Sequence, residues 1–245
     1  MKNIDSVVQS MKNILIDFEV SNKEIDNCCD MFERVLKGLF TMDDAFSFID
    51  HGAFKETYSL TDDLVIKFCS IDNNTNDEMY ILDVATKAGL NDIFLPTRQI
   101  DVSDFAQHCF LSHIAQDYGR GYSYNSYYKD LNPEYHADTV LIQKKIKNTY
   151  EESHGYVAHW VSDYALHPVS DSLTNRIVEY SYIRDTMNME AIDWLQSLMD
   201  NFGSEYFYSV GKFIKKHHIH DLHTSNVGYY TKGDKILPCI IDWLS

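Results

Sequence analysis

The feature that most constrains the fold is a regular alternation of apolar and polar residues in "FSFIDHGAFKETYSLTDDLVIKFCS", residues 46–70. Successive side chains of a β-strand point to opposite faces, so this alternation is typical of strands with one face buried. The tripeptide "TDD", residues 61–63, interrupts the pattern with residues that favour turns. We therefore expect half-buried antiparallel strands on either side of this turn.

Apolar residues on both sides of this region recur at helical spacing. Residues 4–18 and 25–40 predict two amphipathic helices before the strands. "NDEMYILDVATKAGL", residues 76–90, predicts a helix after them, closed by Lys87 and Gly89. Three later segments predict further strands: "IFLPTRQIDV", "HCFLSHIA" and "DTVLIQKKI". The expected order is two helices, two or three strands, a helix, and two or three more strands.

The second half of the chain changes character. "AIDWLQSLMDNF" and "SEYFYSVGKFIKKHHI" predict helices, the latter with Ser204 as its N-cap. "NVGYYTKGDKILPCIID", residues 226–242, predicts a hairpin whose turn contains "KGD". A hairpin brings its two ends together, so we expect Asn226 and Asp242 side by side. The fold class is α+β, with a sheet followed by a mainly helical part.

Composition narrows the partners and the location. The chain has 37 acidic and 21 basic residues, a net charge of -16, which repels nucleic-acid phosphates and argues against a nucleic-acid partner. It contains no signal-peptide pattern and no run of about 20 apolar residues, so we expect no membrane partner and a cytoplasmic location. Five cysteines without C-x-x-C spacing predict reduced thiols.

Three oxygen-bearing side chains near the end of the chain point to a chemistry. Asp221 and Asn226 flank a predicted loop, and Asp242 follows the hairpin. Oxygen ligands alone suit Mg²⁺ or Mn²⁺, ions that commonly carry the phosphates of a nucleotide. Phosphoryl transfer also needs a carboxylate to orient the attacking hydroxyl, a role that Asp221 fits.

The predicted strands offer a phosphate cover and a cation. Gly52 allows the backbone to approach phosphates, and Phe54 would cap the tip of that turn. Lys67 lies in "VIKF", where a strand would point it inward. A buried lysine needs a carboxylate, and Glu78 in the following helix is the candidate.

"DLHTSN", residues 221–226, and "IIDW", residues 240–243, resemble the catalytic loop and the metal-binding segment of protein kinases. In these motifs the chain resembles small Ser/Thr kinases of short-tailed phages, and more distantly aminoglycoside phosphotransferases. The resemblance implies a two-lobed fold with a helical extension (residues 1–43), an N-lobe (44–147) and a truncated, mainly helical C-lobe (148–245). The catalytic loop would be residues 219–226 and the metal-binding segment 240–243.

The same resemblance implies ATP and Mg²⁺ (or Mn²⁺) as cofactors and assigns a role to each candidate residue. Asp221 would be the catalytic base, with His223 near the γ-phosphate. Asn226 and Asp242 would bind the metal. Adenine would bind at a hinge, residues 141–146. The expected nucleotide-binding residues are Gly52, Ala53, Phe54, Lys67, Glu78, Gln143, Lys144 and Lys145.

The chain also departs from the kinase pattern. Asp50 and Lys55 occupy two of the three glycine positions of the phosphate loop, and Ile219 stands where most kinases have His. The resemblance implies a phage-encoded Ser/Thr kinase that modifies host proteins in the host cytoplasm. Two alternatives are a pseudokinase that acts by docking to a host protein and a phosphotransferase for a small molecule. The Tyr-rich residues 117–135 predict an ordered insertion or a protein contact.

Overall fold

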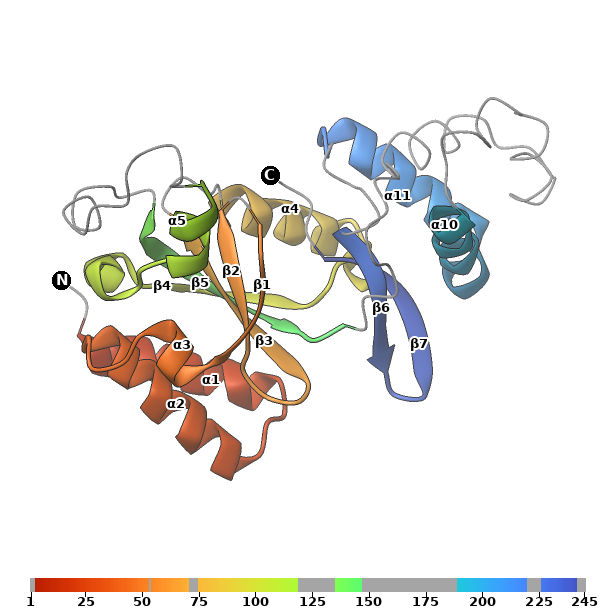
Figure 1. Ribbon diagram of the computed structural model, residues 1–245. Helices are drawn as coiled ribbons and strands as arrows, with labels where there is room; N and C mark the ends of the chain where they lie inside the picture. Colours follow the sequence, from red (N-terminus) through yellow and green to blue (C-terminus); the bar gives the residue numbers. More distant parts are fainter. Residues whose placement is uncertain are drawn as a thin grey trace. The chain divides into compact units, whose positions relative to one another are not determined.

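The chain folds as an α+β protein with a five-stranded antiparallel sheet (Figure 1). The computed structural model describes residues 3–52, 54–70, 75–118, 135–146, 189–219 and 226–241. The chain divides into two compact units, which are described separately below: Met1–Thr75 with Pro96–Lys145, and Asn76–Leu95 with Ile146–Ser245. No helix within the described ranges is long and apolar enough to cross a membrane.

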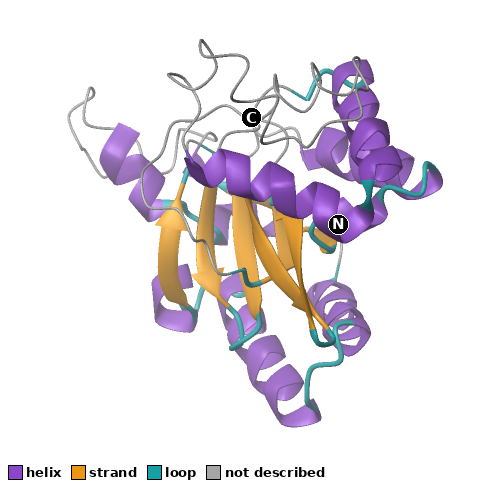
Figure 2. Ribbon diagram, turned by 90° about the vertical axis from the view of Figure 1, so that its right-hand side faces the viewer, coloured by secondary structure: helices purple, strands orange, loops and turns teal. Residues whose placement is uncertain are grey.

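The sheet forms the centre of the first unit, as Figure 2 shows. Its strands lie in the order β1-β2-β3-β5-β4. The predicted turn after residue 60 is confirmed, because the Thr61 hydroxyl accepts the N–H groups of Asp63 (3.2 Å) and Leu64 (3.1 Å). The alternating region, residues 46–70, contains three strands, β1 to β3. The strands are β1 (Ser47–His51), β2 (Lys55–Ser59), β3 (Leu64–Ser70), β4 (Thr97–Asp101) and β5 (Ala137–Lys144).

A layer of helices covers one face of this sheet, as Figure 1 shows. Both predicted N-terminal helices are confirmed as α1 (Ile4–Asp17) and α2 (Asn22–Leu36), and the short α3 (Met42–Ala45) follows. Ile66 and Phe68 of β3 belong to the core that these helices form with the sheet. The expectation of half-buried strands is wrong for β3, because every residue of this central strand is buried.

The predicted strand at residues 108–115 is wrong. The segment contains the end of a 3₁₀ helix, η2 (Ser103–His108), and the start of α5 (Ser112–Tyr118). The carboxylate of Glu56 on β2 accepts the backbone N–H groups of His113 (2.7 Å) and Ile114 (2.9 Å). It also accepts the Tyr58 hydroxyl (2.7 Å). A carboxylate satisfies the first N–H groups of a helix, so this contact favours helix over strand here.

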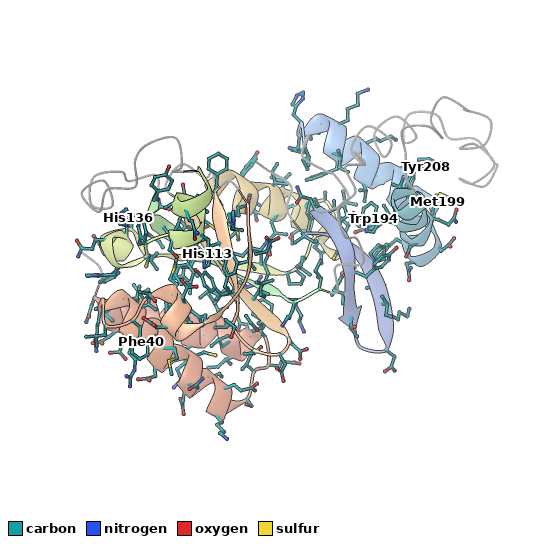
Figure 3. All side chains as sticks on the ribbon, in the orientation of Figure 1. Phe40, His113, His136, Trp194, Met199 and Tyr208 are labelled. Atoms are coloured by element: carbon teal, nitrogen blue, oxygen red, sulfur yellow. The ribbon has the colours of Figure 1, made fainter. Side chains whose placement is uncertain are left out.

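The second unit combines helices with a hairpin. Its elements are α4 (Thr75–Lys87, of which Thr75 belongs to the first unit), η1 (Asn91–Ile93), α10 (Met189–Phe202), α11 (Ser204–Lys216), β6 (Val227–Lys232) and β7 (Lys235–Ile240). Trp194 of α10 faces the hairpin (Figure 3), and its indole N–H donates to the Gly228 carbonyl (3.1 Å). Trp194 and Phe207 are buried in the core of this unit.

The ends of two helices test the predicted caps. Gly89 closes α4 with a φ of +72°, as predicted, and the following N–H, of Leu90, donates to the Ala85 carbonyl (2.8 Å). The predicted N-cap of α11, Ser204, is wrong, because Gly203 holds that position. Gly203 also ends α10 by donating its N–H to the Met199 carbonyl (2.8 Å), and its φ of +84° is one that glycine adopts readily.

We expect the cysteines of the native protein to react slowly with iodoacetamide at pH 8. All five are buried and free, and burial raises the pKa of Cys28 to about 11 and those of Cys109 and Cys239 to about 12. The thiolate is the nucleophile, so little reactive species exists at this pH. Mass spectrometry should show five alkylated cysteines only after denaturation. Rapid labelling of any of the three in the native protein would contradict this expectation.

Candidate functional site

The hairpin predicted near the end of the chain is confirmed. Strands β6 and β7 are joined by a tight turn in which Gly233 has a φ of +61°. At the open end, the Ile241 N–H donates to the Asn226 carbonyl (2.8 Å). The two ends of the hairpin therefore meet at Asn226 and Ile241, while the predicted proximity of Asn226 to Asp242 stays a prediction. Asp242 is the next residue in the sequence and lies outside the described residues.

The predicted catalytic residues Asp221 and His223 also lie outside the described residues, but both flanks of their loop are described. On one side, Ile219 is buried in the core of the second unit, and its N–H donates to the Ile214 carbonyl (3.1 Å). On the other side is Asn226, held by the hairpin. Segment 220–225 therefore starts and ends at anchored residues of one compact unit.

Lys67 lies at the centre of β3, directly opposite Thr57 of β2 and Leu141 of β5. Its predicted burial is confirmed, because only 8% of the residue is exposed. Its neighbours along β3, Ile66 and Phe68, point into the helical layer, so Lys67 points to the opposite face of the sheet. Its role in phosphate binding stays a prediction.

Glu78, the predicted partner of Lys67, lies on α4 and is 4% exposed. A buried carboxylate, like a buried ammonium, is stable only when it is paired or hydrogen-bonded. Glu78 belongs to the second unit and Lys67 to the first. The ion pair between them stays a prediction.

The predicted phosphate loop connects β1 to β2. The Gly52 N–H donates to the Lys55 carbonyl (2.9 Å), and the Phe54 carbonyl accepts the Ser70 N–H (2.8 Å). Phe54 is 39% exposed, and Ala53 lies outside the described residues. No described atom lies within 4 Å of the place where a Cβ on Gly52 would be, so packing does not require glycine there. Gly52 is exposed, and its N–H is already used within the turn, so its role in phosphate binding stays a prediction.

The predicted hinge begins inside the sheet. Gln143 is paired on both sides in β5, is 2% exposed, and donates its Nε2–H to the Thr97 hydroxyl (2.8 Å). Thr97, the first residue of β4, pairs with Gln143, so the next residue of β5, Lys144, lies opposite Pro96. Pro96 has no N–H to donate. The Lys145 N–H donates to the carbonyl of Asp63, in the turn between β2 and β3 (2.7 Å). Lys144 is thus the first hinge residue at which pairing with the β4 side stops.

Sequence reasoning missed two buried charges on β2. Lys55 is 8% exposed and Glu56 is 0% exposed. In the sequence, Lys55 stands out only as a departure from the glycine pattern. The sequence did contain a signal. Lys55 and Glu56 are adjacent charged residues in the alternating region, and adjacent residues of a strand point to opposite faces, so at least one of them was expected on the buried face.

Comparison with protein-family models, with curated proteins and with solved structures found no match for this chain. Within the described ranges, no group of three His, Cys, Asp or Glu residues could hold a metal ion. Of the three oxygen donors that the sequence predicts around the metal and the reacting hydroxyl, only Asn226 falls in these ranges.

Proposed function

We propose that the chain is an ATP-dependent phosphotransferase that transfers a phosphoryl group to Ser or Thr of a host protein. The observation that carries the proposal is the burial of Lys67 at the centre of the sheet, on the face opposite the helical layer. Burying an ammonium group is costly unless negative groups surround it. The phosphates of a nucleotide, together with a paired carboxylate, would supply that charge.

The hairpin supports a metal site next to the transferred group. Asn226 lies at its open end, bonded to Ile241, and Asp242 follows Ile241 in the chain. One amide and one carboxylate oxygen fit the preference of Mg²⁺ for oxygen ligands. When bound, the ion would neutralise charge on the phosphates. Asp221 would accept the proton of the attacking hydroxyl, and His223 would lie near the γ-phosphate.

The end of β5 supports an adenine site. Pro96 has no N–H, so it cannot donate a hydrogen bond to the carbonyl of Lys144. That carbonyl could instead accept a hydrogen bond from the amino group of adenine. Gln143 would then line the site with its buried side chain, and its backbone would stay in the sheet. In this arrangement the first unit provides the nucleotide-binding sheet of a two-lobed fold, and the second provides the catalytic loop.

ATP with Mg²⁺ should raise the melting temperature. A ligand present at 100 times its Kd that binds only the folded state stabilises it by about 2.7 kcal/mol. For a chain of this size, that corresponds to a shift of about 5–10 °C in differential scanning fluorimetry. The control is adenosine at the same concentration, which lacks the phosphates that Lys67 would bind.

The proposal fails if millimolar ATP leaves the melting temperature and the calorimetric signal unchanged with either Mg²⁺ or Mn²⁺. Transfer is measured separately, by incubating the protein with γ-labelled ATP and a host lysate. Binding without labelling of any protein would favour the docking alternative, and labelling of small metabolites alone would favour the small-molecule alternative.

A further inference from the structure

We propose that the C-terminal end of α11 binds acidic side chains of the protein substrate, close to the Ser or Thr that receives the phosphoryl group. The binding residues are Lys212, Lys215 and Lys216, which are all exposed. This inference rests on the proposed function and names the substrate class of its site. The class is protein segments in which Asp or Glu residues flank the acceptor hydroxyl.

The three lysines lie on the exposed side of α11. Helix residues three and four apart share a face, so Lys212 lies next to both Lys215 and Lys216. The opposite side of the helix is buried in the core of the second unit through residues such as Phe207 and Ile214. The lysines are therefore accessible to a partner, and the packed helix beneath them fixes their spacing.

The lysines of α11 form no ion pair with any residue that the structure describes. Acidic residues outnumber basic ones in this chain, 37 to 21. Five exposed cations elsewhere do pair with a carboxylate: Lys12 with Asp26, Arg34 with Asp30, Lys37 with Glu33, Lys87 with Asp83 and Lys232 with Asp92. The one acidic residue of α11, Glu205, lies in its first turn, about 10 Å before Lys212 along the axis. Three neighbouring ammonium groups repel one another, so a ligand with several negative charges is favoured there.

The helix dipole explains only part of this charge. The partial negative charge at the C-terminus of a helix stabilises cations in the last turn, where Lys215 and Lys216 lie. Lys212 lies one turn earlier, where this effect has fallen off. The potential at this end of the helix is positive, because Lys216 and His218 add to the effect of burial in lowering the pKa of His217. An anionic partner is therefore attracted to it.

The chain connects these lysines to the proposed catalytic base. Helix α11 ends at Lys216, the Ile219 N–H donates to the Ile214 carbonyl (3.1 Å), and Asp221 follows two residues later. Five residues span at most about 18 Å, so Lys216 lies within that distance of Asp221. An extended substrate segment covers the same distance in about five residues. The acidic side chains should therefore lie within about five positions of the acceptor.

An acidic protein segment fits this surface better than a nucleic acid. Affinity for nucleic acid grows with the number of phosphates contacted, and a net charge of -16 opposes a long polyanion. The repulsion matters less for a short segment, because exposed charges more than about 8 Å apart are largely screened at physiological salt. The proposed reaction itself brings the acceptor segment to Asp221, and so to the neighbouring lysines.

The test compares three peptides with a single Ser, flanked on both sides by Asp, by Asn or by Lys. With Mg²⁺ and γ-labelled ATP, the kcat/KM of the unaltered protein should be about 10-fold higher for the Asp peptide than for the Asn peptide, a value that three exposed ion pairs can supply. The Lys peptide should be the poorest substrate. The preference for Asp should shrink several-fold from about 0.1 M to about 1 M salt, because salt screens exposed charges.

Combining Lys212→Gln, Lys215→Gln and Lys216→Gln should abolish the preference for Asp. The loss should appear in KM rather than in kcat, because these lysines bind the substrate without touching the reacting atoms. Replacing the same three residues with Arg keeps the charges and should keep the preference. If the combined Gln variant does not fold, Lys216→Gln alone gives the same comparison, with a loss of about two-fold, a third of the three-pair effect in free energy.

A matched control removes three charges from the first unit. Lys12→Gln, Lys23→Gln and Lys37→Gln combined change exposed positions of α1 and α2, where surface ion pairs contribute little to stability. This variant has the same net charge as the α11 variant. It should keep the preference for Asp, which separates a local effect of α11 from an effect of overall charge.

Peptide binding is also measured without transfer, by fluorescence anisotropy of the labelled Asp and Asn peptides. Equal affinity for the two peptides in the unaltered protein, or a preference that survives in the folded α11 Gln variant, overturns the inference while the proposed function stands. Tighter binding of a labelled oligouridylate than of the Asp peptide overturns it in favour of a nucleic-acid surface. If the protein labels neither peptides nor a host lysate, but binds the Asp peptide through α11, the proposed function fails and the acid-binding surface is supported.

Discussion

Replacing Asp221 with Asn is expected to lower the rate of phosphoryl transfer about 100-fold or more, and to leave ATP affinity within a few-fold of the unaltered protein. The substitution keeps the size of the side chain but removes the carboxylate that would accept the hydroxyl proton, and a general base usually contributes 10²–10⁴-fold. Transfer of label from γ-labelled ATP measures the rate, and calorimetry measures the affinity.

Asp242→Ala is the contrasting variant. It removes the charged ligand of the proposed metal site, whose other ligand, Asn226, is neutral, so both ATP affinity and transfer should fall. An Asp221→Asn protein that transfers phosphate at the normal rate would show that Asp221 is not the base. If both variants reproduce every effect of the unaltered protein in the host cell, the docking alternative is correct.

Replacing Glu56 with Ala is expected to lower the free energy of unfolding by about 3 kcal/mol. The carboxylate accepts three hydrogen bonds, from the N–H groups of His113 and Ile114 and from the Tyr58 hydroxyl. Glu56 is 0% exposed, so the donors in this buried contact lose their acceptor when it is removed. A buried polar group without a partner costs about 1–3 kcal/mol. Urea unfolding followed by circular dichroism measures the loss.

Two milder variants make this test specific. Glu56→Gln keeps an oxygen that can accept the N–H groups of α5, so it should cost less than Glu56→Ala. Tyr58→Phe removes only one of the three hydrogen bonds and should cost about 1 kcal/mol. If Glu56→Ala unfolds at the same urea concentration as the unaltered protein, the contact does not hold α5 in place.

Local patterns predicted most of the elements correctly. Helical spacing is a property of about a dozen neighbouring residues, and it is sufficient to place α1, α2, α4 and α10. The turn between β6 and β7 follows from Gly233, which adopts a positive φ at low cost. Burial of Lys67 was predicted from the apolar residues around it in "VIKF". In each of these cases the cause lies within a few residues of the effect.

Only the tertiary structure decided the features whose cause lies far along the chain. Residues 108–115 have an apolar pattern that suits a strand, but the carboxylate that caps α5 comes from Glu56, 57 residues before His113. The shared face of Lys55 and Lys67 depends on the register between β2 and β3, and the open pairing at Lys144 depends on Pro96 of a distant segment. Periodicity reports which residues of one element share a face. It does not report which groups another element brings to that face, because packing and register set those contacts.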